Sequence, residues 1–330
     1  MLKLSDFNYN LPAELIAQYP LKERAEAKLL VLNRKQGTIG HRIFKDIPEY
    51  ICKNDLLVLN DTRVLACRLK GRRKTGGKIE ILLIRQKEDL IFEALIRPAR
   101  IRLGEKVYFN EDKLSCELIA KNLVRFQATD VNEIYKYGQV PLPPYIKRDP
   151  EDLDSVYYQT VYARNNGSIA SPTAGLHFSE GLLAKIKSLG PNCAYITLHI
   201  SYSTFKPVKS EDITRHKMEK EYFQIDEETA QLINGTHSRG GRILAVGTTS
   251  CRALESYAAG NTNGETDLFI YPGYKFNLVD CLLTNFHLPQ TTLFMLTCAF
   301  GGMGLVKKAY IEAVEKKYRF YSYGDAMLII

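Results

Sequence analysis

The amino-acid sequence predicts an α/β protein, in which a mixed or parallel sheet domain is interrupted by a small antiparallel β-barrel or sandwich. Apolar runs of strand length alternate with helical patterns at both ends of the chain, short alternating segments fill its middle, and a proline-rich stretch separates the two patterns. We therefore expect one α/β domain built from residues 1–61 and 147–330, with residues 62–146 inserted as a second domain.

The first part of the α/β domain contains one helix signal and two strand signals. Pro12 and the following AELIAQ are typical of the start of a short helix. KLLVLNR (28–34) and DLLVLN (55–60) are apolar runs of strand length. The second run is continuous rather than alternating, which predicts a strand covered on both faces.

The inserted segment reads as a series of short strands with little helix. Several of its pieces alternate apolar and polar residues, and glycine-rich or charged breaks such as RRKTGGK and NEDK separate them. It ends in VPLPPYI (140–146), whose prolines cannot continue a helix or a sheet interior. The expected strands are VLACRLK, KIEILLI, LIFEALI, KVYF, LSCELIA and LVRFQA.

After residue 147 the chain returns to strands and helices, with three polar loops leading into helices. Ser179 is placed to cap a helix that Gly190-Pro191 ends, and CAYITLHI (193–200) follows as a strand. RILAVGTTS leads into the helix CRALESYAAG and then the expected strand DLFIYP, and CLLTNFHLPQTT leads into the helix LFMLTCAF. GTTS (247–250) also has the residues of a good helix N-cap, a role compatible with ligand binding.

Those three loops carry the side chains that we consider first as a site. If their strands are neighbours, the loops converge beyond the carboxyl ends of the strands, where open α/β sheets form ligand crevices and helix N-termini present free N–H groups. Imidazoles there are suited to proton transfer. The side chains are Thr173 and His177, then Thr248, Thr249 and Ser250, then Asn285 and His287.

The net charge of +8 is concentrated in the inserted segment. Residues 62–146 hold 17 Lys and Arg against 10 Asp and Glu, whereas all other residues hold 28 against 27. A local excess of positive charge is typical of a polyanion-binding surface, although a solvated basic surface explains it equally well. Two clusters stand out: Arg63, Arg68, Lys70, Arg72, Arg73 and Lys74, which run without an acid, and Arg97, Arg100 and Arg102.

Other features exclude several classes of protein. There is no P-loop and no G-x-G-x-x-G after a strand, so a conventional nucleotide kinase or nicotinamide enzyme is disfavoured. The seven cysteines are dispersed without a C-x-x-C, and no histidine pair has the spacing of a metal clip, so we expect neither a disulfide framework nor a metal. No signal-peptide pattern or membrane-length apolar run occurs, so we expect a soluble cytoplasmic protein.

Two further stretches have alternative interpretations. In RHKMEKEYF (215–223), His216 and Glu221 form an acid/base pair if they meet, whereas Glu219 and Lys220 read as a charged surface turn. In NDTRV (60–64), Asp61 and Arg63 form either a turn with a surface pair or part of a cleft between the two domains.

Eight strings in order resemble the S-adenosylmethionine:tRNA ribosyltransferase-isomerase family of queuosine biosynthesis. The resemblance covers essentially the whole chain. The three strings PTAGLHF, VGTTS-x-RALE and LLTNFHLP are specific as a set. The eight are LNDTRV, KTGGKIEILL, PLPPYI, YQTVYA, SPTAGLHF, AVGTTSCRALE, LLTNFHLP and YSYGDAMLI.

The resemblance implies an α/β domain with an inserted Greek-key β-barrel. It also implies transfer and isomerisation of the ribosyl group of S-adenosylmethionine onto 7-aminomethyl-7-deazaguanine at the tRNA wobble position. The products are epoxyqueuosine-tRNA, adenine and methionine. S-adenosylmethionine is then a co-substrate, no cofactor or metal is implied, and the protein is expected to be a monomer.

On this basis we assign expected roles. His177 and His287 are the first acid/base candidates, and His199, His216 and Glu221 also match the family pattern. We expect Thr173, Thr248, Thr249, Ser250 and Asn285 to hold the donor. We expect tRNA to be oriented by Asp61, Arg63, Arg68, Arg72, Arg73, Lys74, Arg97 and Arg100.

The sequence departs from the family pattern at three positions. Ser201 and Ser203 stand where glycines are expected, which puts a tight backbone turn in doubt. Glu219 stands where a histidine is expected, so that histidine position is not assigned an essential role. An RNA-binding module without chemistry and an S-adenosylmethionine-dependent RNA methyltransferase remain the alternatives.

Overall fold

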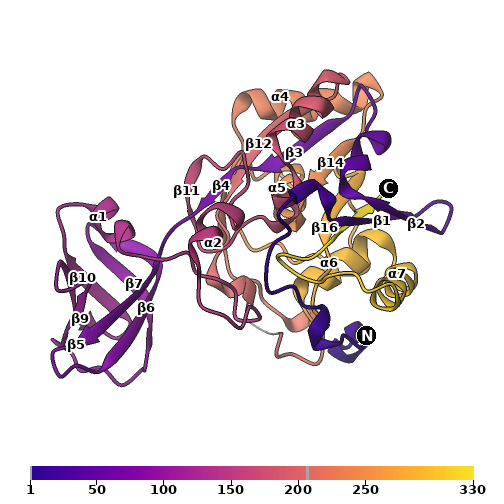
Figure 1. Ribbon diagram of the computed structural model, residues 1–330. Coiled ribbons are helices and arrows are strands. Elements are labelled where there is room, and N and C mark those ends of the chain that lie inside the picture. The colour runs from indigo at the N-terminus through magenta and orange to yellow at the C-terminus, as the bar shows by residue number, and fades with distance from the viewer. Residues whose placement is uncertain (1, 206–207) are drawn as a thin grey trace.

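The computed structural model describes residues 2–205 and 208–330 and contains two domains (Figure 1). The α/β domain carries both ends of the chain, and the β-barrel projects from one side of it. This arrangement confirms the predicted fold class of a mixed α/β sheet with an inserted antiparallel barrel. Among the described helices, none is both long and apolar enough to cross a bilayer.

The α/β domain is built on a nine-stranded sheet of order β15-β13-β12-β3-β14-β16-β17-β1-β2. The pairs β12/β3, β3/β14, β14/β16 and β17/β1 are parallel, and the others are antiparallel. The strands are β1 Lys28–Asn33, β2 Thr38–Ile43, β3 Leu56–Asn60, β12 Asn192–Leu198, β13 Glu221–Gln224, β14 Ile243–Val246, β15 Asn263–Thr266, β16 Cys281–Asn285 and β17 Ala326–Ile329.

Strand β3 lies in the middle of the sheet, and all five of its residues are buried. Leu56 and Val58 belong to the apolar core on one face, whereas Leu57 and Leu59 belong to the core on the other. Successive side chains of a strand point to opposite faces, so a continuous apolar run needs cover on both. The prediction from DLLVLN is confirmed.

Helices and short 3₁₀ turns cover the two faces. The α-helices of this domain are α2 Asp152–Tyr157, α3 Glu180–Ser188, α4 Glu227–Thr236, α5 Thr248–Ala258, α6 Thr292–Gly301 and α7 Met303–Glu315. The 3₁₀ turns are Leu4–Phe7, Ala13–Leu15, Arg24–Glu26, Phe44–Tyr50, Thr173–His177, Tyr202–Phe205, Ile213–Arg215 and His237–Arg239. As predicted, the Ser179 hydroxyl caps α3 by accepting from the Leu182 N–H at 3.2 Å.

The inserted barrel is closed, with the order β10-β7-β6-β5-β8-β9. Because β8 returns to lie beside β5, the first four strands form a Greek key. Gly71 is required in β5, since a Cβ there would lie 2.6 Å from the Phe109 ring. The strands are β5 Arg68–Arg73, β6 Lys78–Glu88, β7 Ile91–Arg97, β8 Lys106–Phe109, β9 Leu114–Ala120 and β10 Leu123–Gln127, followed by helix α1 Val131–Lys136.

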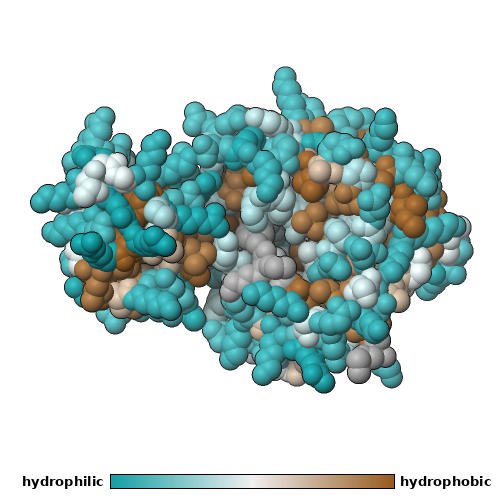
Figure 2. All heavy atoms as spheres, turned by 90° about the horizontal axis from the view of Figure 1, so that it is seen from below, coloured by the Kyte–Doolittle hydropathy of each residue, from teal (hydrophilic) through white to brown (hydrophobic). Residues whose placement is uncertain are grey.

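The chain enters and leaves the barrel close together. Arg68, at the start of β5, forms an antiparallel bridge with Gln139, just after α1. Strand β4 (Thr62–Val64) pairs in parallel with β11 (Asn165–Ser168), which comes after the chain has returned to the α/β domain. The barrel strands therefore lie well inside the segment 62–146. Seen from below, the barrel forms a separate lobe with a predominantly hydrophilic surface (Figure 2).

Two predicted elements are wrong. AELIAQ forms only the single 3₁₀ turn Ala13–Leu15. DLFIYP (267–272) is not a strand, and the strand in this region is β15, just before it. The reason is local, because two side chains use the backbone hydrogen-bonding groups of Leu268 that a strand would need for pairing. The Leu268 N–H donates to Thr266 Oγ1 at 3.2 Å, and the Leu268 carbonyl accepts from Arg252 Nε at 3.0 Å.

Candidate active site

A pocket lies beyond the carboxyl ends of the neighbouring strands β14 and β16, where the three polar loops meet. The loops contribute residues 171–174, residues 247–249, and Thr284, Asn285 and His287. Two of the loops follow sheet strands, as predicted, but the first follows β11, which lies outside the main sheet. Thr173, Thr248, Thr249, Asn285 and His287 line the pocket.

The start of helix α5 forms one wall of this pocket. Gly247 is the N-cap residue, with φ of 94°, and no side chain caps the helix. The stretch GTTS therefore holds the N-cap of α5, as expected, and the capping residue is its glycine. The Thr249 hydroxyl instead accepts from Asn60 Nδ2 at 3.2 Å, and Ser250 Oγ donates to the Val246 carbonyl at 2.9 Å. Ser250 is fully buried and is not among the residues that line the pocket.

His287 is a buried imidazole in the pocket wall. Its ring Nε2 lies 2.7 Å from Thr284 Oγ1, and its backbone N–H donates to the Tyr310 hydroxyl at 3.1 Å. The Tyr9 hydroxyl donates to its carbonyl. Burial lowers the pKa of His287 to about 3, because the protonated ring would lose its hydration. The ring is therefore neutral at pH 7.

His177 is also buried, but it faces a different, smaller pocket. Its neighbours there include Arg24, Tyr157 and Ser322, and its ring packs on Phe44 with centroids 5.0 Å apart. Burial lowers the pKa of His177 to about 3, and the neighbouring Asn285 amide opposes this shift. No hydrogen bond satisfies His177 Nε2 within the described chain. The structure thus separates His177 from His287.

Asn285 stands between the two pockets. Its Nδ2 donates to the Tyr321 carbonyl at 2.9 Å, and Tyr321 has the left-handed φ of 73°. The centroids of the Tyr145 and Tyr321 rings lie 3.8 Å apart, and the Tyr145 hydroxyl forms a hydrogen bond with the Ser322 hydroxyl. Tyr145, from the proline-rich return of the barrel, therefore closes the pocket together with Tyr321 and Ser322.

A buried ion pair also lines this pocket. Arg252 Nη1 pairs with Glu221 Oε2, and the two side chains are 6% and 2% exposed. Glu221 Oε1 accepts from the Ser201 N–H at 2.9 Å and from Thr204 Oγ1 at 3.1 Å. Arg252 is not among the site residues expected from the sequence. Its signal is the one basic residue of SCRALE, in which Glu255 is the other charged side chain.

A cleft of about 1180 Å³ separates the barrel from the α/β domain. Leu83–Gln86 of β6 and part of α1 line it from the barrel side, and His199 and His216 line it from the other. Burial lowers the pKa of both histidines. Ile200, Met218 and Glu221 line the cleft and the loop pocket alike, so these three residues form a shared wall.

His199, which lines the cleft, and the buried Asp61 are each held by neighbouring side chains. His199 Nδ1 lies 2.8 Å from Thr62 Oγ1. A Cβ at Gly167, whose φ is 154°, would lie 2.6 Å from the His199 ring. Asp61 is 5% exposed and accepts from Thr197 Oγ1 at 2.7 Å and from Asn165 Nδ2 at 3.1 Å. Asp61 therefore ties β12 to β11, whereas Arg63 is exposed.

His216 does not form the anticipated pair with Glu221. The His216 ring packs edge-on against Phe269 at 5.2 Å, while Arg252 is the ion partner of Glu221. Ser201 does not have the left-handed backbone that a glycine would favour, and its N–H helps to hold Glu221. The side chain of Ser203 lies outside the described part of the chain. Glu219 lines the cleft.

The predicted cations of the barrel fall into two groups. Arg68, Arg72 and Arg73 form ion pairs with Glu80, Asp112 and Glu105 at 2.6, 2.6 and 3.2 Å. Lys74, Arg97 and Arg100 are exposed and have no ion pair within residues 2–205 and 208–330. These three lie at one rim of the barrel, toward the opposite end of β6 and β7 from the cleft.

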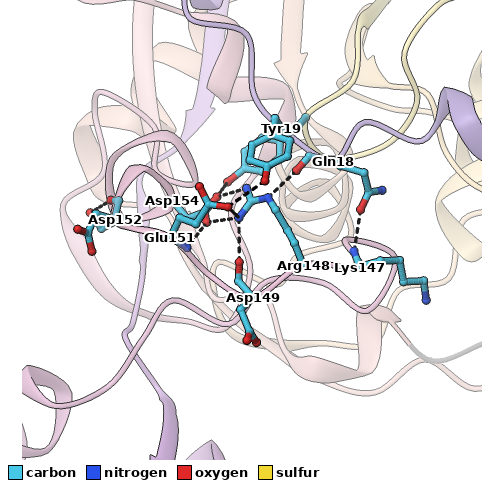
Figure 3. Close-up of polar contacts among 10 residues, drawn as sticks. Gln18, Tyr19, Lys147, Arg148, Asp149, Glu151, Asp152 and Asp154 are labelled. Atoms are coloured by element: carbon cyan, nitrogen blue, oxygen red, sulfur yellow. Dashed lines mark hydrogen bonds and ion pairs between the residues drawn. The ribbon is translucent and has the colours of Figure 1, made fainter.

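A clamp fastens the chain where it returns from the barrel (Figure 3). Arg148 donates to both oxygens of the fully buried Asp154 at 2.6 and 2.7 Å. Its Nε donates to the Gln18 carbonyl at 3.0 Å, and its guanidinium lies 4.2 Å from the centre of the Tyr19 ring. Tyr323 adds a hydrogen bond to Asp154 at 2.7 Å. The clamp thus joins the return segment to both chain ends.

Nothing among the described residues forms a group of three or more His, Cys, Asp or Glu side chains able to hold a metal ion. The seven cysteines are free thiols. The expectation that the site needs neither metal nor cofactor stays a prediction.

Comparison with known proteins identifies relatives over the full length. A family model described as "Queuosine biosynthesis protein" matches residues 4–329. The S-adenosylmethionine:tRNA ribosyltransferase-isomerases of Sulfurihydrogenibium sp. (strain YO3AOP1) and Aquifex aeolicus (strain VF5) are 52% and 46% identical, with all of both chains covered. The crystal structure of S-adenosylmethionine tRNA ribosyltransferase from Thermotoga maritima is similar with a TM-score of 0.58 and 38% identity, over 98% of this chain and 100% of that one.

Proposed function

Because the chain belongs to the S-adenosylmethionine:tRNA ribosyltransferase-isomerase family, we propose that S-adenosylmethionine binds in the loop pocket and that the tRNA base approaches from the cleft. The protein transfers and isomerises the ribosyl group of S-adenosylmethionine onto 7-aminomethyl-7-deazaguanine in tRNA, with release of adenine and methionine. Two substrates must therefore meet, and the proposal concerns where.

The shared wall of Ile200, Met218 and Glu221 is the observation that carries this proposal. The loop pocket is enclosed by helix α5, two buried loops and Tyr145, which suits a small donor that has to be kept from water. The cleft is about 1180 Å³ and lies between domains, which suits part of a macromolecule. A donor and an acceptor on either side of one wall need only a short movement to react.

His287 is proposed as the proton acceptor in the loop pocket. The reaction requires removal of a proton from C5′ of the donor, which the neighbouring sulfonium acidifies. A pKa of about 3 keeps His287 neutral at pH 7, so one of its ring nitrogens carries a free lone pair for the proton. Thr284 orients the ring through the contact at Nε2.

His177 is proposed to act on the same reaction through Asn285, since it faces the smaller pocket. The acceptor amine must react in its neutral form, and His199 and His216 line the cleft through which it approaches. We assign them to that side of the reaction. Thr173, Thr248 and Thr249 are assigned to the donor, and Ser250 supports the helix that carries two of them.

We propose that tRNA contacts the cleft and the exposed cations of the barrel. Arg63, Lys74, Arg97 and Arg100 are available to phosphates, whereas Arg68, Arg72 and Arg73 are already paired with acids. Asp61 contributes indirectly, by holding Asn165 and Thr197 behind the cleft.

The activity is tested by incubating the protein with S-adenosylmethionine and tRNA that bears the aminomethyl base, followed by nucleoside mass spectrometry. Epoxyqueuosine with free adenine and methionine is the expected result. A methylated nucleoside with S-adenosylhomocysteine would instead identify a methyltransferase, and tight tRNA binding without product would identify a binding module.

The placement of the two substrates is tested by filling each cavity. Thr248→Phe narrows the loop pocket and is expected to abolish donor binding while tRNA still binds. Asn132→Trp, on α1, narrows the cleft and is expected to weaken tRNA binding while the donor still binds. Thermal melts identify any variant that fails to fold. A normal KM for S-adenosylmethionine in folded Thr248→Phe would refute the donor site.

We further propose that the protein works as a cytoplasmic monomer without metal or cofactor. Its seven free thiols fit a reducing compartment, where the tRNA substrate also occurs. Light scattering is expected to give the mass of one 37.5 kDa chain. Activity is expected to survive dialysis against a chelator, and its loss would show that a metal is needed.

A further inference from the structure

The guanidinium of Arg252 is only partly used by the protein. Arg252 is 5% exposed and belongs to helix α5, and it lines the loop pocket. Its Nε donates to the Leu268 carbonyl at 3.0 Å, and its Nη1 pairs with Glu221. Its Nη2 is buried and has no hydrogen-bond partner in the described chain.

A buried guanidinium nitrogen without a partner is unfavourable, because its N–H groups have lost their hydration without replacement. Glu221 does not supply an acceptor for Arg252 Nη2, since its oxygens are shared among Arg252 Nη1, the Ser201 N–H and the Thr204 hydroxyl. The Arg252 guanidinium is thereby fixed through Nε and Nη1, while the N–H groups of Nη2 have no acceptor in the described chain. That edge is suited to an acceptor supplied by a ligand.

The surroundings of the pocket favour a negatively charged acceptor. The first turn of α5 faces the pocket, and the backbone N–H groups at a helix start carry partial positive charge. His287 in the same wall is neutral at pH 7, and burial raises the pKa of Tyr145 and Tyr321, so these phenols are neutral as well. Glu221 is the acidic residue of the lining, and it is already paired.

We propose that Arg252 binds the carboxylate of the amino-acid part of the donor through Nη2. This inference rests on the proposed donor site and adds the chemical group that the site recognises. The same contact holds methionine after the ribosyl group has left, since methionine keeps that carboxylate. Arg252 therefore selects donors that have an intact amino acid and makes methionine a product inhibitor competitive with S-adenosylmethionine.

The experiment compares S-adenosylmethionine with its decarboxylated analogue, which lacks only the carboxylate. Wild-type protein is expected to use the analogue with kcat/KM lower by about 10- to 100-fold, the range for a charge-assisted hydrogen bond. In Arg252→Lys, which keeps a cation beside Glu221, we expect the two donors to differ by less than about 3-fold. Inhibition by methionine should weaken in parallel.

Two additional variants serve as the matched control and as a substitute if Arg252→Lys does not fold. Arg242→Lys is the matched control, because Arg242 also pairs with a buried acid, Asp55 at 2.6 Å, but lies outside the pocket; it should keep the full discrimination. If Arg252→Lys does not fold, the double variant Arg252→Met with Glu221→Gln removes both buried charges together. It should likewise lose the discrimination between donors.

The outcomes separate this inference from the proposed function. Equal use of both donors by the wild type, or undiminished discrimination in the Arg252 variants, would overturn the role of Arg252. Loss of activity on both donors by the same factor would also overturn it, because Arg252 would then only support the pocket. Each of these results leaves the donor site standing, which fails only if the Thr248→Phe variant binds S-adenosylmethionine normally.

Discussion

The loop pocket and the barrel surface use similar residue types in opposite ways. In the pocket, His287 and Arg252 are each 5% exposed, and their few polar contacts fix them in one orientation. On the barrel, Arg72 is 52% exposed and forms a surface ion pair with Asp112. A buried polar group acts individually because its lost hydration must be replaced, whereas exposed charges act mainly through their sum.

The largest expected effect comes from the pocket. His287→Gln should lower kcat by about 100-fold or more, because glutamine can hydrogen-bond to Thr284 but cannot accept a proton. The backbone contacts of His287 with Tyr9 and Tyr310 do not depend on its side chain, so the variant should fold. Single-turnover kinetics with saturating tRNA measures the effect.

The matched control for His287→Gln is His41→Gln. His41 lies on the edge strand β2 and contacts Tyr318 and Glu312, far from the pocket in the sheet order. It should retain normal turnover. If His287→Gln turned over as fast as this control, proton transfer by His287 would be ruled out.

The second effect concerns the segment that connects the two regions. Asp154→Asn removes the charge that Arg148 needs at the clamp (Figure 3) and should lower the free energy of unfolding by about 3–5 kcal/mol. Urea denaturation followed by tyrosine fluorescence measures this. Asp149→Asn is the control, because Asp149 is 74% exposed and pairs with Lys70 at the surface; an equal loss in both variants would contradict the clamp.

The third effect is the acid sensitivity of the buried imidazoles. The folded pKa values of His177 and His287 are about 3, below the usual 6.5, so the unfolded chain binds their protons first as the pH falls. Their contribution is complete above pH 6.5 and is lost on acidification toward pH 3. Between pH 6.5 and 5, protonation of each histidine in the unfolded chain should lower the free energy of unfolding by about 2 kcal/mol.

The pH dependence is measured by urea denaturation at half-unit steps from pH 7 to pH 5. His177→Gln and His287→Gln should each flatten the decline in stability over that range, and the double variant should flatten it about twice as much. A decline that is unchanged in the double variant would mean that these two rings are not the groups that titrate.

The same contrast explains what the sequence could predict. Local patterns located β3, β14 and β16, the three loops and the barrel, because burial and turn chemistry are written in neighbouring residues. The insertion of β17 between β16 and β1 has no such local signal, since it depends on pairing over long distances in the chain. The partner of Glu221 was missed for that reason, as Arg252 is 31 residues away.

The net charge of the barrel segment does not reveal which of its cations are free. The segment 62–146 holds the positive excess, as the composition shows, but sequence could not tell which cations are neutralised by acids on adjacent strands and loops. Arg68 and Glu80 meet only because β5 pairs with β6. Whether an arginine is free for phosphate is thus a property of strand register.

The smallest expected effect tests this distinction directly. Removing Lys74, Arg97 and Arg100 together by substitution with serine should weaken tRNA binding several-fold and reduce the slope of log affinity against log salt by about 2–3. The matched triple variant replaces the paired Arg68, Arg72 and Arg73 by serine, and should change the slope by less than half as much, because those charges are already balanced. Filter binding at several salt concentrations measures both slopes. Both variants lower the net charge equally, so any difference between them comes from local contacts. Equal slopes would mean that tRNA senses only the total charge of the barrel, and the division into free and paired cations would then have no functional meaning.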